Sequence, residues 1–423
     1  MKKVSIIGLG YVGLPLMCAV AKSGKYEVVG FDISSKRIAD VKKRVCPIND
    51  EQCQKDLLEV EFVASSDELV LENSDYQIIC VPTPVHSDHT PDYDPLVGAA
   101  ELVAQHLKKG STVIVESTIN PGTCEEIVKP VLEKISGMVC PGDFVMAHCP
   151  ERINPGDPKW SVYNIPRNVG TIPEQEANKT ADFYKSFIKA DVNPVSNIKI
   201  AESTKIIENT FRDLNIAFVN ELAQSFDRMG IDLFETIKAA SNKPFAFMPH
   251  WPGCGVGGHC IAVDPYYLIK RAEVSGFNHR FLKEARTINN YMPTYSVVRL
   301  MEGLNEVGKS LKGTRVLMLG LSYKPNVGDT RESPSFEILE ILKSYGAQVS
   351  VVDPFAEGFD ISLDEAMKNV EAVFLTTAHK VFVENLTPAY LKKHKIKVVV
   401  DGRNALDKRG IIKSGIIYKG IGR

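Results

Sequence analysis

The first residues of the sequence contain the pattern that most restricts the fold. Gly8, Gly10 and Gly13 follow the apolar run VSII and precede an apolar helical pattern. Glycines at this spacing, between a strand and a helix, are typical of dinucleotide-binding turns. The first allows a tight turn, the second lets the backbone approach a pyrophosphate, and the third allows close helix packing. The helix dipole favours the phosphates. We therefore expect a Rossmann-type α/β domain at the start of the chain.

An acidic residue follows the glycines at the spacing expected for NAD. Asp32 lies about 20 residues after Gly13, where the next predicted strand ends. Its carboxylate would accept hydrogen bonds from ribose hydroxyls and repel a 2′-phosphate, which favours NAD over NADP. Lys36 and Arg37 could reach a 2′-phosphate, and a purely structural glycine turn is the alternative. The predicted cofactor-binding residues here are Gly8, Gly10, Tyr11, Val12, Gly13, Asp32 and Arg37.

Strand-like and helix-like patterns alternate at both ends of the chain. The apolar runs are VSIIGLG, YEVVGFD, YQIICVPTP, STVIVEST and DFVMAHCP early, then TRVLMLG, AQVSVVDP, EAVFLTT and KVVVDGR late. Strands separated by helices imply parallel sheets, and 423 residues exceed one typical core. We predict an α/β protein with two Rossmann-like parallel-sheet domains, joined by a long central helix with a small helical domain. The expected boundaries are 1–195 for NAD binding, 196–300 for the helical part and 301–423 for the second sheet.

Ligands of such sheets bind beyond the carboxyl ends of the strands. Thr83, in VPTP, and Thr118, in EST, each follow a predicted strand in the first domain. We expect both threonines to contact cofactor or substrate.

The central segment carries a polar stripe on a long predicted helix. Lys205, Asn209 and Arg212 are spaced i, i+4 and i+7, which places them on one helical face. Cationic and amide donors that converge on one point can stabilise a developing oxyanion. A solvated face of a surface helix is the alternative. A helix of this length also suits a connector and a subunit interface.

The stretch GVGGHCIAVDPYYL contains a cysteine that residue patterns alone do not assign. Cys260 follows a run of glycines that would let a ligand approach, and Asp264 lies one helical turn later. Cys260 could be a structural cysteine, a nucleophile, or a metal ligand with His259 and Cys254. The adjacent His-Cys pair lacks the usual metal-ligand spacing, so no metal is expected. A nucleophile suits an NAD enzyme, because a thiol can convert an aldehyde into a thioester.

Composition excludes several functional classes. A formal charge of -2 gives no basic field for nucleic acid or a membrane surface. The nine cysteines are scattered without a CxxC pair, and the apolar N-terminus lacks a clear cleavage site. We expect a cytoplasmic protein without disulfides, nucleic-acid partners or membrane association.

Five longer motifs together resemble the nucleotide-sugar 6-dehydrogenases of the UDP-glucose and UDP-mannose type, over nearly the whole chain. They are GLGYVGLP, CPERINPG, KIIENTFRDLNIAFVNELA, GVGGHCIAVDPYYL and GLSYKPNVGDTRESP. The resemblance implies NAD-dependent oxidation of the C6 alcohol of a UDP-sugar to a carboxylate by two hydride transfers, for surface or capsular polysaccharide precursors. It also implies a homodimer or higher homo-oligomer built on the central helices.

The same resemblance implies residue roles. Cys260 would form the thioester, Lys205 and Asn209 would stabilise the oxyanion, Asp264 and Thr118 would position water, and Glu151 would act in acid–base steps. Arg331 would contact the cofactor. The implied substrate-binding residues are Glu151, Arg152, Lys205, Asn209, Arg212, Lys243, Gly257, Lys324 and Arg403, with Lys243 reaching a neighbouring subunit.

Two departures from the UDP-glucose enzymes bear on the sugar. Those enzymes usually carry a GGSCxPKD-type segment and lack ENTFRDLN, whereas this chain has GGHCIAVDPYY and Arg212 within FRDLN. The departures resemble the UDP-N-acetylhexosamine branch. The stretches STINPGTCEE and ERINPGD resemble members that use UDP-GlcNAc or UDP-GalNAc, and UDP-ManNAc stays an alternative. Three alternatives remain: a UDP-glucose 6-dehydrogenase, a two-electron hydroxyacid-type dehydrogenase that needs no cysteine, and a non-catalytic nucleotide-sugar sensor.

Overall fold

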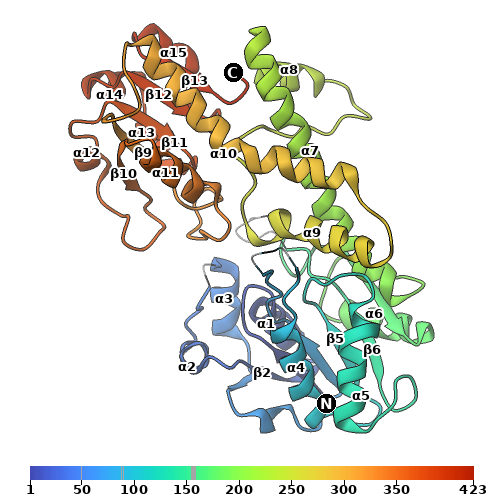
Figure 1. Cartoon of the computed structure of the whole chain (residues 1–423). Helices are drawn as coiled ribbons and strands as arrows, with labels where there is room; N and C mark the ends of the chain where they lie inside the picture. Colours follow the sequence, from blue (N-terminus) through green and yellow to red (C-terminus); the bar gives the residue numbers. More distant parts are fainter. Residues whose placement is uncertain (49, 87, 89, 154–158) are drawn as a thin grey trace. The chain divides into compact units, whose positions relative to one another are not determined.

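The computed structural model describes residues 1–48, 50–86, 88, 90–153 and 159–423, with the side chain of His259 left out. The described chain forms two compact units. The first unit comprises Met1–Glu208 and Tyr266–Phe277, and the second comprises Asn209–Pro265 and Asn278–Arg423. Each unit contains one sheet, so the α/β class with two Rossmann-like sheets is confirmed (Figure 1). The boundaries at 195 and 300 stay a prediction.

The sheet of the first unit has eight strands in the order β3-β2-β1-β4-β5-β6-β7-β8. Every neighbouring pair is parallel except β6 and β7, which are antiparallel. The order reverses between β1 and β4, so the loops after these two strands flank the crevice where such sheets bind ligands. The strands are β1 Lys2–Ile7, β2 Tyr26–Phe31, β3 Val63–Ser65, β4 Tyr76–Ile79, β5 Thr112–Val115, β6 Val145–His148, β7 Arg167–Ile172 and β8 Val192–Pro194.

Helices cover both faces of this sheet, because its buried strands are apolar on both sides. Successive residues of β5 show the alternation: Ile114 packs in one core cluster, whereas Val113 and Val115 pack in the other. Figure 1 shows α1, α4 and α5 beside the strands. The helices of this unit are α1 Gly13–Lys22, α2 Ser35–Lys42, α3 Glu51–Glu59, α4 Asp94–Gln105, α5 Lys129–Ser136 and α6 Ala177–Lys185, with shorter helical turns at Glu68–Leu71, Cys124–Val128 and Glu174–Glu176.

The sheet of the second unit has five parallel strands in the order β10-β9-β11-β12-β13. Its order reverses between β9 and β11, which places a second ligand crevice at the loops after those strands. Helix α10 packs on β12 and β13, and α11 packs on β10 and on α10 (Figure 1). The strands are β9 Arg315–Leu319, β10 Gln348–Val352, β11 Ala372–Leu375, β12 Val398–Asp401 and β13 Ile417–Gly420.

Long helices occupy the middle of the chain. The predicted central helix is α7, Ile198–Met229, with 32 residues, and it contributes to both units. The remaining helices are α8 Leu233–Ala240, α9 His259–Val274, α10 Arg280–Glu306, α11 Pro334–Ser344, α12 Leu363–Ala366, α13 Lys380–Asn385, α14 Pro388–Lys393 and α15 Lys408–Lys413.

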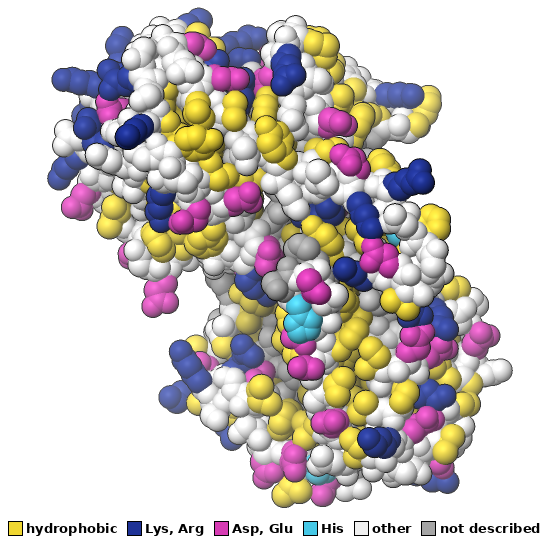
Figure 2. All heavy atoms as spheres, viewed as in Figure 1, with side chains coloured by type: hydrophobic (Ala, Val, Ile, Leu, Met, Phe, Trp, Pro, Cys, Tyr) yellow, Lys and Arg dark blue, Asp and Glu magenta, His cyan; other side chains and the backbone are white. Residues whose placement is uncertain are grey.

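Charged side chains of both signs are mixed on the surface, as expected from the near-neutral net charge. Figure 2 shows Lys, Arg, Asp and Glu side chains interspersed on the visible face of each unit, without a broad field of one sign. Among the helices that the structure describes, none is long and apolar enough to cross a membrane.

Candidate active site

The glycine turn after β1 has the geometry expected for a pyrophosphate. Gly8 has φ +92°, and a Cβ there would lie 2.7 Å from the Cys80 carbonyl oxygen. A Cβ on Gly13 would collide with the backbone of Gly8, so α1 approaches the turn only because Gly13 lacks a side chain. At Gly10, by contrast, a Cβ would meet no heavy atom within 4 Å. Gly8 and Gly13 are crowded and Gly10 is open, as expected for a turn that binds a dinucleotide pyrophosphate.

Asp32 lies directly after β2 and holds the neighbouring loops together. Its Oδ2 accepts hydrogen bonds from the backbone N–H of Leu9 at 2.9 Å and from Arg37 Nη1 at 3.0 Å. Its Oδ1 accepts from the N–H of Ser34 at 2.8 Å. The Arg37 guanidinium therefore neutralises the carboxylate that the sequence assigned to ribose binding. In the same turn Tyr11 is exposed and Val12 is partly exposed.

Thr83 and Thr118 meet at the carboxyl ends of β4 and β5. The Thr83 hydroxyl donates to the Thr118 carbonyl at 2.7 Å, and Thr83 is buried whereas Thr118 is partly exposed. The Tyr267 hydroxyl, from α9, donates to the Thr83 carbonyl. Tyr267 was not among the predicted site residues, although it lies within the stretch GVGGHCIAVDPYYL.

Glu151 belongs to a buried charge cluster that the sequence did not reveal. Arg167, fully buried on β7, pairs with Glu151 and with Glu116 Oε2, the latter at 2.9 Å. Glu151 Oε1 also accepts from the backbone N–H groups of Arg152 and Ile153 at 2.6 and 2.7 Å. These contacts fix the Glu151 carboxylate in one orientation. No local spacing marks Arg167, because its partners lie in the loops after β5 and β6, far from it in the sequence.

The environment of Glu116 sets it apart from Glu151. The pKa of Glu116 is raised to about 7; burial is the largest cause and the nearby Glu151 charge adds to it, while Arg167 opposes both. Two carboxylates that share one buried guanidinium place a titrating group near neutral pH.

Arg152, the neighbour of Glu151, donates through Nε to Glu208 at 3.1 Å.

Cys260 lies in the first turn of α9, in the second unit. All nine cysteines lie in the described residues, and of these Cys260 alone is exposed. Asp264 follows it by one helical turn and is buried at 2% exposure. Asn209, from α7, donates through Nδ2 to Asp264 Oδ2 at 2.5 Å. The structure thus brings together Asn209 and Asp264, one turn away from the exposed thiol.

The rest of the polar stripe varies in exposure along α7. Lys205 is half-buried, Asn209 is buried at 6% exposure and Arg212 is exposed. Lys205 belongs to the first unit and the other two to the second. Lys243 is exposed after α8, and its ammonium lies 4.9 Å from the Phe245 ring centroid. The roles of these four residues stay predictions.

The glycines before Cys260 pack closely against other parts of the same unit. A Cβ on Gly257 would lie 2.8 Å from the Glu332 carbonyl, and one on Gly258 would lie 2.8 Å from the Tyr323 ring. Gly258, with φ +85°, also donates its N–H to the Arg331 carbonyl at 3.2 Å. Close approach of the segment 320–334 therefore accounts for these glycines. Substrate contact by Gly257 stays a prediction.

Three cationic residues lie in loops after strands of the second sheet. Lys324 follows β9 and Arg403 follows β12, where Arg403 Nε donates to the Thr376 carbonyl at 2.8 Å. Arg331 is exposed and forms a two-point pair with Asp329, with distances of 2.9 and 2.6 Å. The carboxyl ends of parallel strands meet at one edge, which makes this edge suitable for a diphosphate.

The metal alternative for Cys260 involves His259 and Cys254. The side chain of His259 lies outside the described residues. Cys254 is buried in the apolar core of the second unit, and its thiol donates to the Gly402 carbonyl at 3.6 Å. Among the described side chains, no group of three potential ligands could hold a metal ion.

The first unit has the fold and turn geometry of a dinucleotide-dependent oxidoreductase. Comparison with known proteins then identifies the family. Three profiles of the UDP-glucose/GDP-mannose dehydrogenase family match: the NAD binding domain over 2–188, the central domain over 199–291 and the UDP binding domain over 317–408. The chain belongs to this family and is an NAD-dependent nucleotide-sugar dehydrogenase.

Individual relatives match over most of their length. The chain is 40% identical to the UDP-N-acetyl-D-glucosamine 6-dehydrogenase of Pseudomonas aeruginosa, over 90% of this chain and 91% of that protein. It is 38% identical to Protein CapL of Staphylococcus aureus, with 98% and 97% covered. Among solved structures, the UDP-D-ManNAc dehydrogenase of Pyrococcus horikoshii matches with a TM-score of 0.94 and 35% identity, covering 100% of this chain and 99% of that one.

Proposed function

We propose that this enzyme oxidises the C6 alcohol of a UDP-N-acetylhexosamine to a carboxylate through a thioester on Cys260. One observation carries the proposal: the exposed Cys260 thiol lies one helical turn from the buried Asp264–Asn209 hydrogen bond. A nucleophile next to an ordered carboxylate and amide is suited to both the formation and the hydrolysis of an acyl intermediate. A non-catalytic sensor has no use for that arrangement.

The chain's residues divide the work of the reaction. When bound, NAD+ supplies an acceptor for one hydride in each of two oxidations. Lys205 and Asn209 stabilise the alkoxide during the first oxidation. The Cys260 sulfur then adds to the aldehyde carbon, and the resulting thiohemiacetal loses the second hydride to become a thioester. Asp264 and Thr118 orient the water that releases the carboxylate and regenerates the thiol. Glu151 acts in the proton transfers of this step.

Overall, one alcohol, two NAD+ and one water give one carboxylate, two NADH and three protons. The nucleotide part of the substrate is held by Lys324 and Arg403, with Arg152, Arg212, Lys243 and Gly257 as further substrate contacts. Arg331 contacts the cofactor. The enzyme acts in the cytoplasm and supplies precursors of surface or capsular polysaccharides.

The sugar is an N-acetylhexosamine rather than glucose. The GGHCIAVDPYY and FRDLN stretches favour an N-acetylhexosamine, and the STINPGTCEE and ERINPGD stretches favour UDP-GlcNAc or UDP-GalNAc. The printed names of relatives support the N-acetylhexosamine class, since they include UDP-N-acetyl-D-glucosamine and UDP-N-acetyl-D-mannosamine dehydrogenases. UDP-ManNAc is therefore the remaining candidate.

A substrate panel tests the sugar assignment. NADH formation is measured with UDP-glucose, UDP-GlcNAc, UDP-GalNAc and UDP-ManNAc under the same conditions. We expect kcat/KM to be at least about 100-fold higher for one N-acetylhexosamine than for UDP-glucose, because a site that hydrogen-bonds the acetamido group loses those bonds with glucose. Activity confined to UDP-glucose would overturn the assignment.

Replacement of the thiol tests the chemistry. Cys260→Ala should abolish formation of the uronic acid, while the affinities for NAD+ and UDP, measured by calorimetry, should change less than about threefold. Cys46→Ser, at a partly buried cysteine of the first unit, is the control and should keep wild-type turnover. Acid formation by the Cys260→Ala enzyme at the wild-type rate would exclude the thioester route.

A further inference from the structure

The turn after β9 repeats the backbone geometry of the dinucleotide turn after β1. Gly320 has φ +103° and donates its N–H to the Val352 carbonyl at 2.9 Å, as Gly8 does to Phe31 at 2.8 Å. The first acidic residue after the second strand also recurs. Asp353 Oδ2 accepts from the N–H of Leu321 at 2.7 Å, in the manner of Asp32. The turn after β9 in the second unit thus has the same backbone arrangement as the turn after β1.

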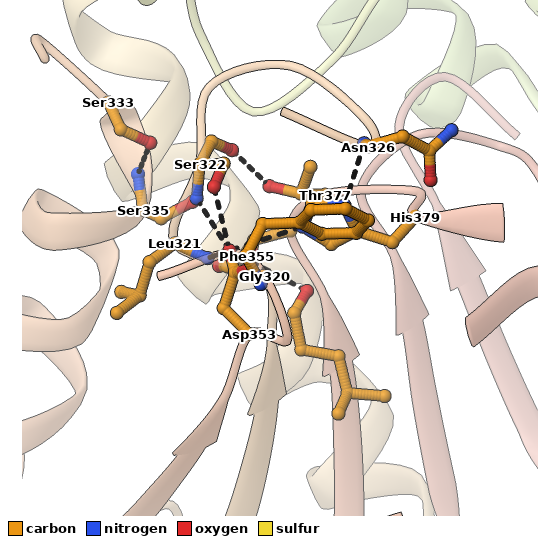
Figure 3. A network of polar contacts seen from close by, with 12 residues as sticks. Gly320, Leu321, Ser322, Asn326, Ser333, Ser335, Asp353, Phe355, Thr377 and His379 are labelled. Carbon is orange, nitrogen blue, oxygen red and sulfur yellow. Dashed lines mark hydrogen bonds and ion pairs between the residues drawn. The ribbon is translucent and has the colours of Figure 1, made fainter. Parts of the chain in front are cut away.

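Asp353 accepts more hydrogen bonds than the one from Leu321 that the two turns share. Its Oδ2 also accepts from the N–H and hydroxyl of Ser322 at 2.8 and 3.0 Å, and its Oδ1 accepts from the N–H of Phe355 at 2.8 Å. Although burial alone would raise it, the hydrogen bonds from His379 and these N–H groups hold the pKa of Asp353 well below its usual range. Figure 3 shows the donors converging on this carboxylate.

His379 completes the network from the loop after β11. It is fully buried, and its Nε2 lies 3.1 Å from Asp353 Oδ2. Its Nδ1 lies 2.8 Å from the backbone nitrogen of Asn326 and must accept that N–H. Nε2 therefore carries the proton, and a neutral imidazole bridges the two groups. The ring is stacked on Phe355, with centroids 4.9 Å apart, and Phe382 meets its edge at 5.4 Å.

Asn326 closes the far end of the loop that begins at Gly320. Its backbone is left-handed, with φ +60°, and its Oδ1 accepts from the N–H of Lys380 at 2.9 Å. The loop 320–326 is therefore attached at one end to Asp353 and at the other to His379 and Lys380. Lys324, the proposed nucleotide contact, lies between the two attachments in the sequence.

We propose that His379 is a positioning residue for nucleotide binding. Its neutral imidazole links Asp353 to Asn326 and so fixes the loop that presents Lys324. The inference rests on the proposed function, since it requires that Lys324 contact the UDP part of the substrate. It assigns to the loop after β11 a task that neither the motifs nor the family match assigns to it.

Two substitutions separate the two bonds of His379. His379→Gln retains a donor near the position of Nε2 but loses the acceptor for Asn326, and His379→Asn retains that acceptor but loses the donor. A third variant, Asn326→Gly, preserves the left-handed backbone and removes only the bond to Lys380. This variant leaves both bonds of His379 in place, so it tests whether the attachment of this end of the loop governs nucleotide binding even if a His379 variant fails to fold.

The readouts are UDP affinity by calorimetry and steady-state kinetics. We expect each variant to weaken UDP binding and raise KM for the UDP-sugar by about threefold to tenfold, the effect of one lost hydrogen bond. kcat and KM for NAD+ should stay within about twofold of the wild-type values. Equal UDP affinity in wild type and variants, or a parallel rise of both KM values, would overturn the proposal.

A matched control lies at the amino ends of the strands of the same sheet, opposite the predicted nucleotide site. Glu371, directly before β11, pairs with Lys309 and accepts the N–H of Arg315 at 3.1 Å. Glu371→Gln should lower the melting temperature without changing UDP affinity. If the wild-type protein binds no UDP, the proposed function itself fails. If it binds UDP and the His379 variants bind it equally well, only the positioning role fails.

Discussion

At the scale of single residues, the hydrogen bond between Asn209 and Asp264 gives the most specific expectation. Asp264 is buried, yet it lies one turn from an exposed thiol on the same helix. A carboxylate in this position can orient water for hydrolysis, but it is not needed to form the thioester. Formation and hydrolysis should therefore separate when Asp264 is changed.

Asp264→Asn should let the covalent intermediate accumulate. We expect a burst of about two NADH per enzyme subunit, because two hydride transfers precede the thioester. Steady-state turnover should then be slowed at least about 100-fold. Intact-protein mass spectrometry would detect the acyl adduct on Cys260. Asp360→Asn, at an exposed aspartate of the second unit, is the control and should show no adduct. An Asp264→Asn enzyme with normal steady-state turnover would remove Asp264 from the hydrolysis step.

His148 gives a prediction for stability against pH. Burial at the end of β6 lowers the pKa of His148 to about 3, whereas an unfolded histidine titrates near 6.5. Below about pH 6.5 the unfolded chain binds this proton and the folded chain does not, so stability falls on acidification. Between pH 7 and 5 this residue should cost about 2 kcal/mol. His148→Met should remove that part of the slope in urea unfolding; an unchanged slope would contradict the assignment.

Residue-level prediction succeeded where the chemistry was local. The spacing of Gly8, Gly10 and Gly13 was sufficient to predict a turn with two crowded positions and one open one. Arg167 and His379 could not be predicted this way, because their partners lie in loops that are distant in the sequence. A single sequence carries no signal for such pairs.

At the scale of secondary structure, the glycine segment before α9 changes the interpretation of the quoted stretch. Its glycines allow close packing against the segment 320–334 of the same unit. The packing fixes the start of α9, and with it the position of Cys260.

Strong runs such as YQII and VVVD were predicted as strands, whereas β3, β7, β8 and β13 were not. β3, β8 and β13 are three or four residues long, and β7, with the sequence RNVGTI, carries too few apolar residues for a periodic signal.

Gly258→Ala tests the packing. Gly313 has a similar backbone, with φ +78° against +85° for Gly258, but nothing lies within 4 Å of its Cβ position. Gly313→Ala should cost about 1 kcal/mol, the strain of a left-handed alanine. Gly258→Ala should cost about 1 to 3 kcal/mol more, because Tyr323 must move. Equal losses of unfolding free energy would show that only backbone strain acts at Gly258.

At the scale of the whole molecule, an apolar face of α7 is consistent with the predicted homodimer. Phe211 and Phe218, two turns apart on this helix, are 45% and 57% exposed. Large apolar side chains on one helical face typically mark an association surface. A second copy of this chain is the occupant we propose, since the central helix was expected to form a subunit interface.

Phe218→Glu should convert the assembly to monomers, because a buried carboxylate at the interface has no partner. Light scattering coupled to size-exclusion chromatography measures the mass directly. Phe336→Glu, at a 43% exposed phenylalanine on α11, is the control and should leave the mass unchanged. A wild-type protein that is monomeric at micromolar concentration would contradict the dimer.

The reaction stoichiometry tests the account most directly. A known amount of the preferred UDP-N-acetylhexosamine is converted to completion with excess NAD+, and NADH is quantified by absorbance alongside the uronic acid by mass spectrometry. The thioester route on Cys260 predicts two NADH and one carboxylate per UDP-sugar. One NADH per substrate, with a ketone or aldehyde as the final product, would identify a two-electron dehydrogenase and contradict the central claim.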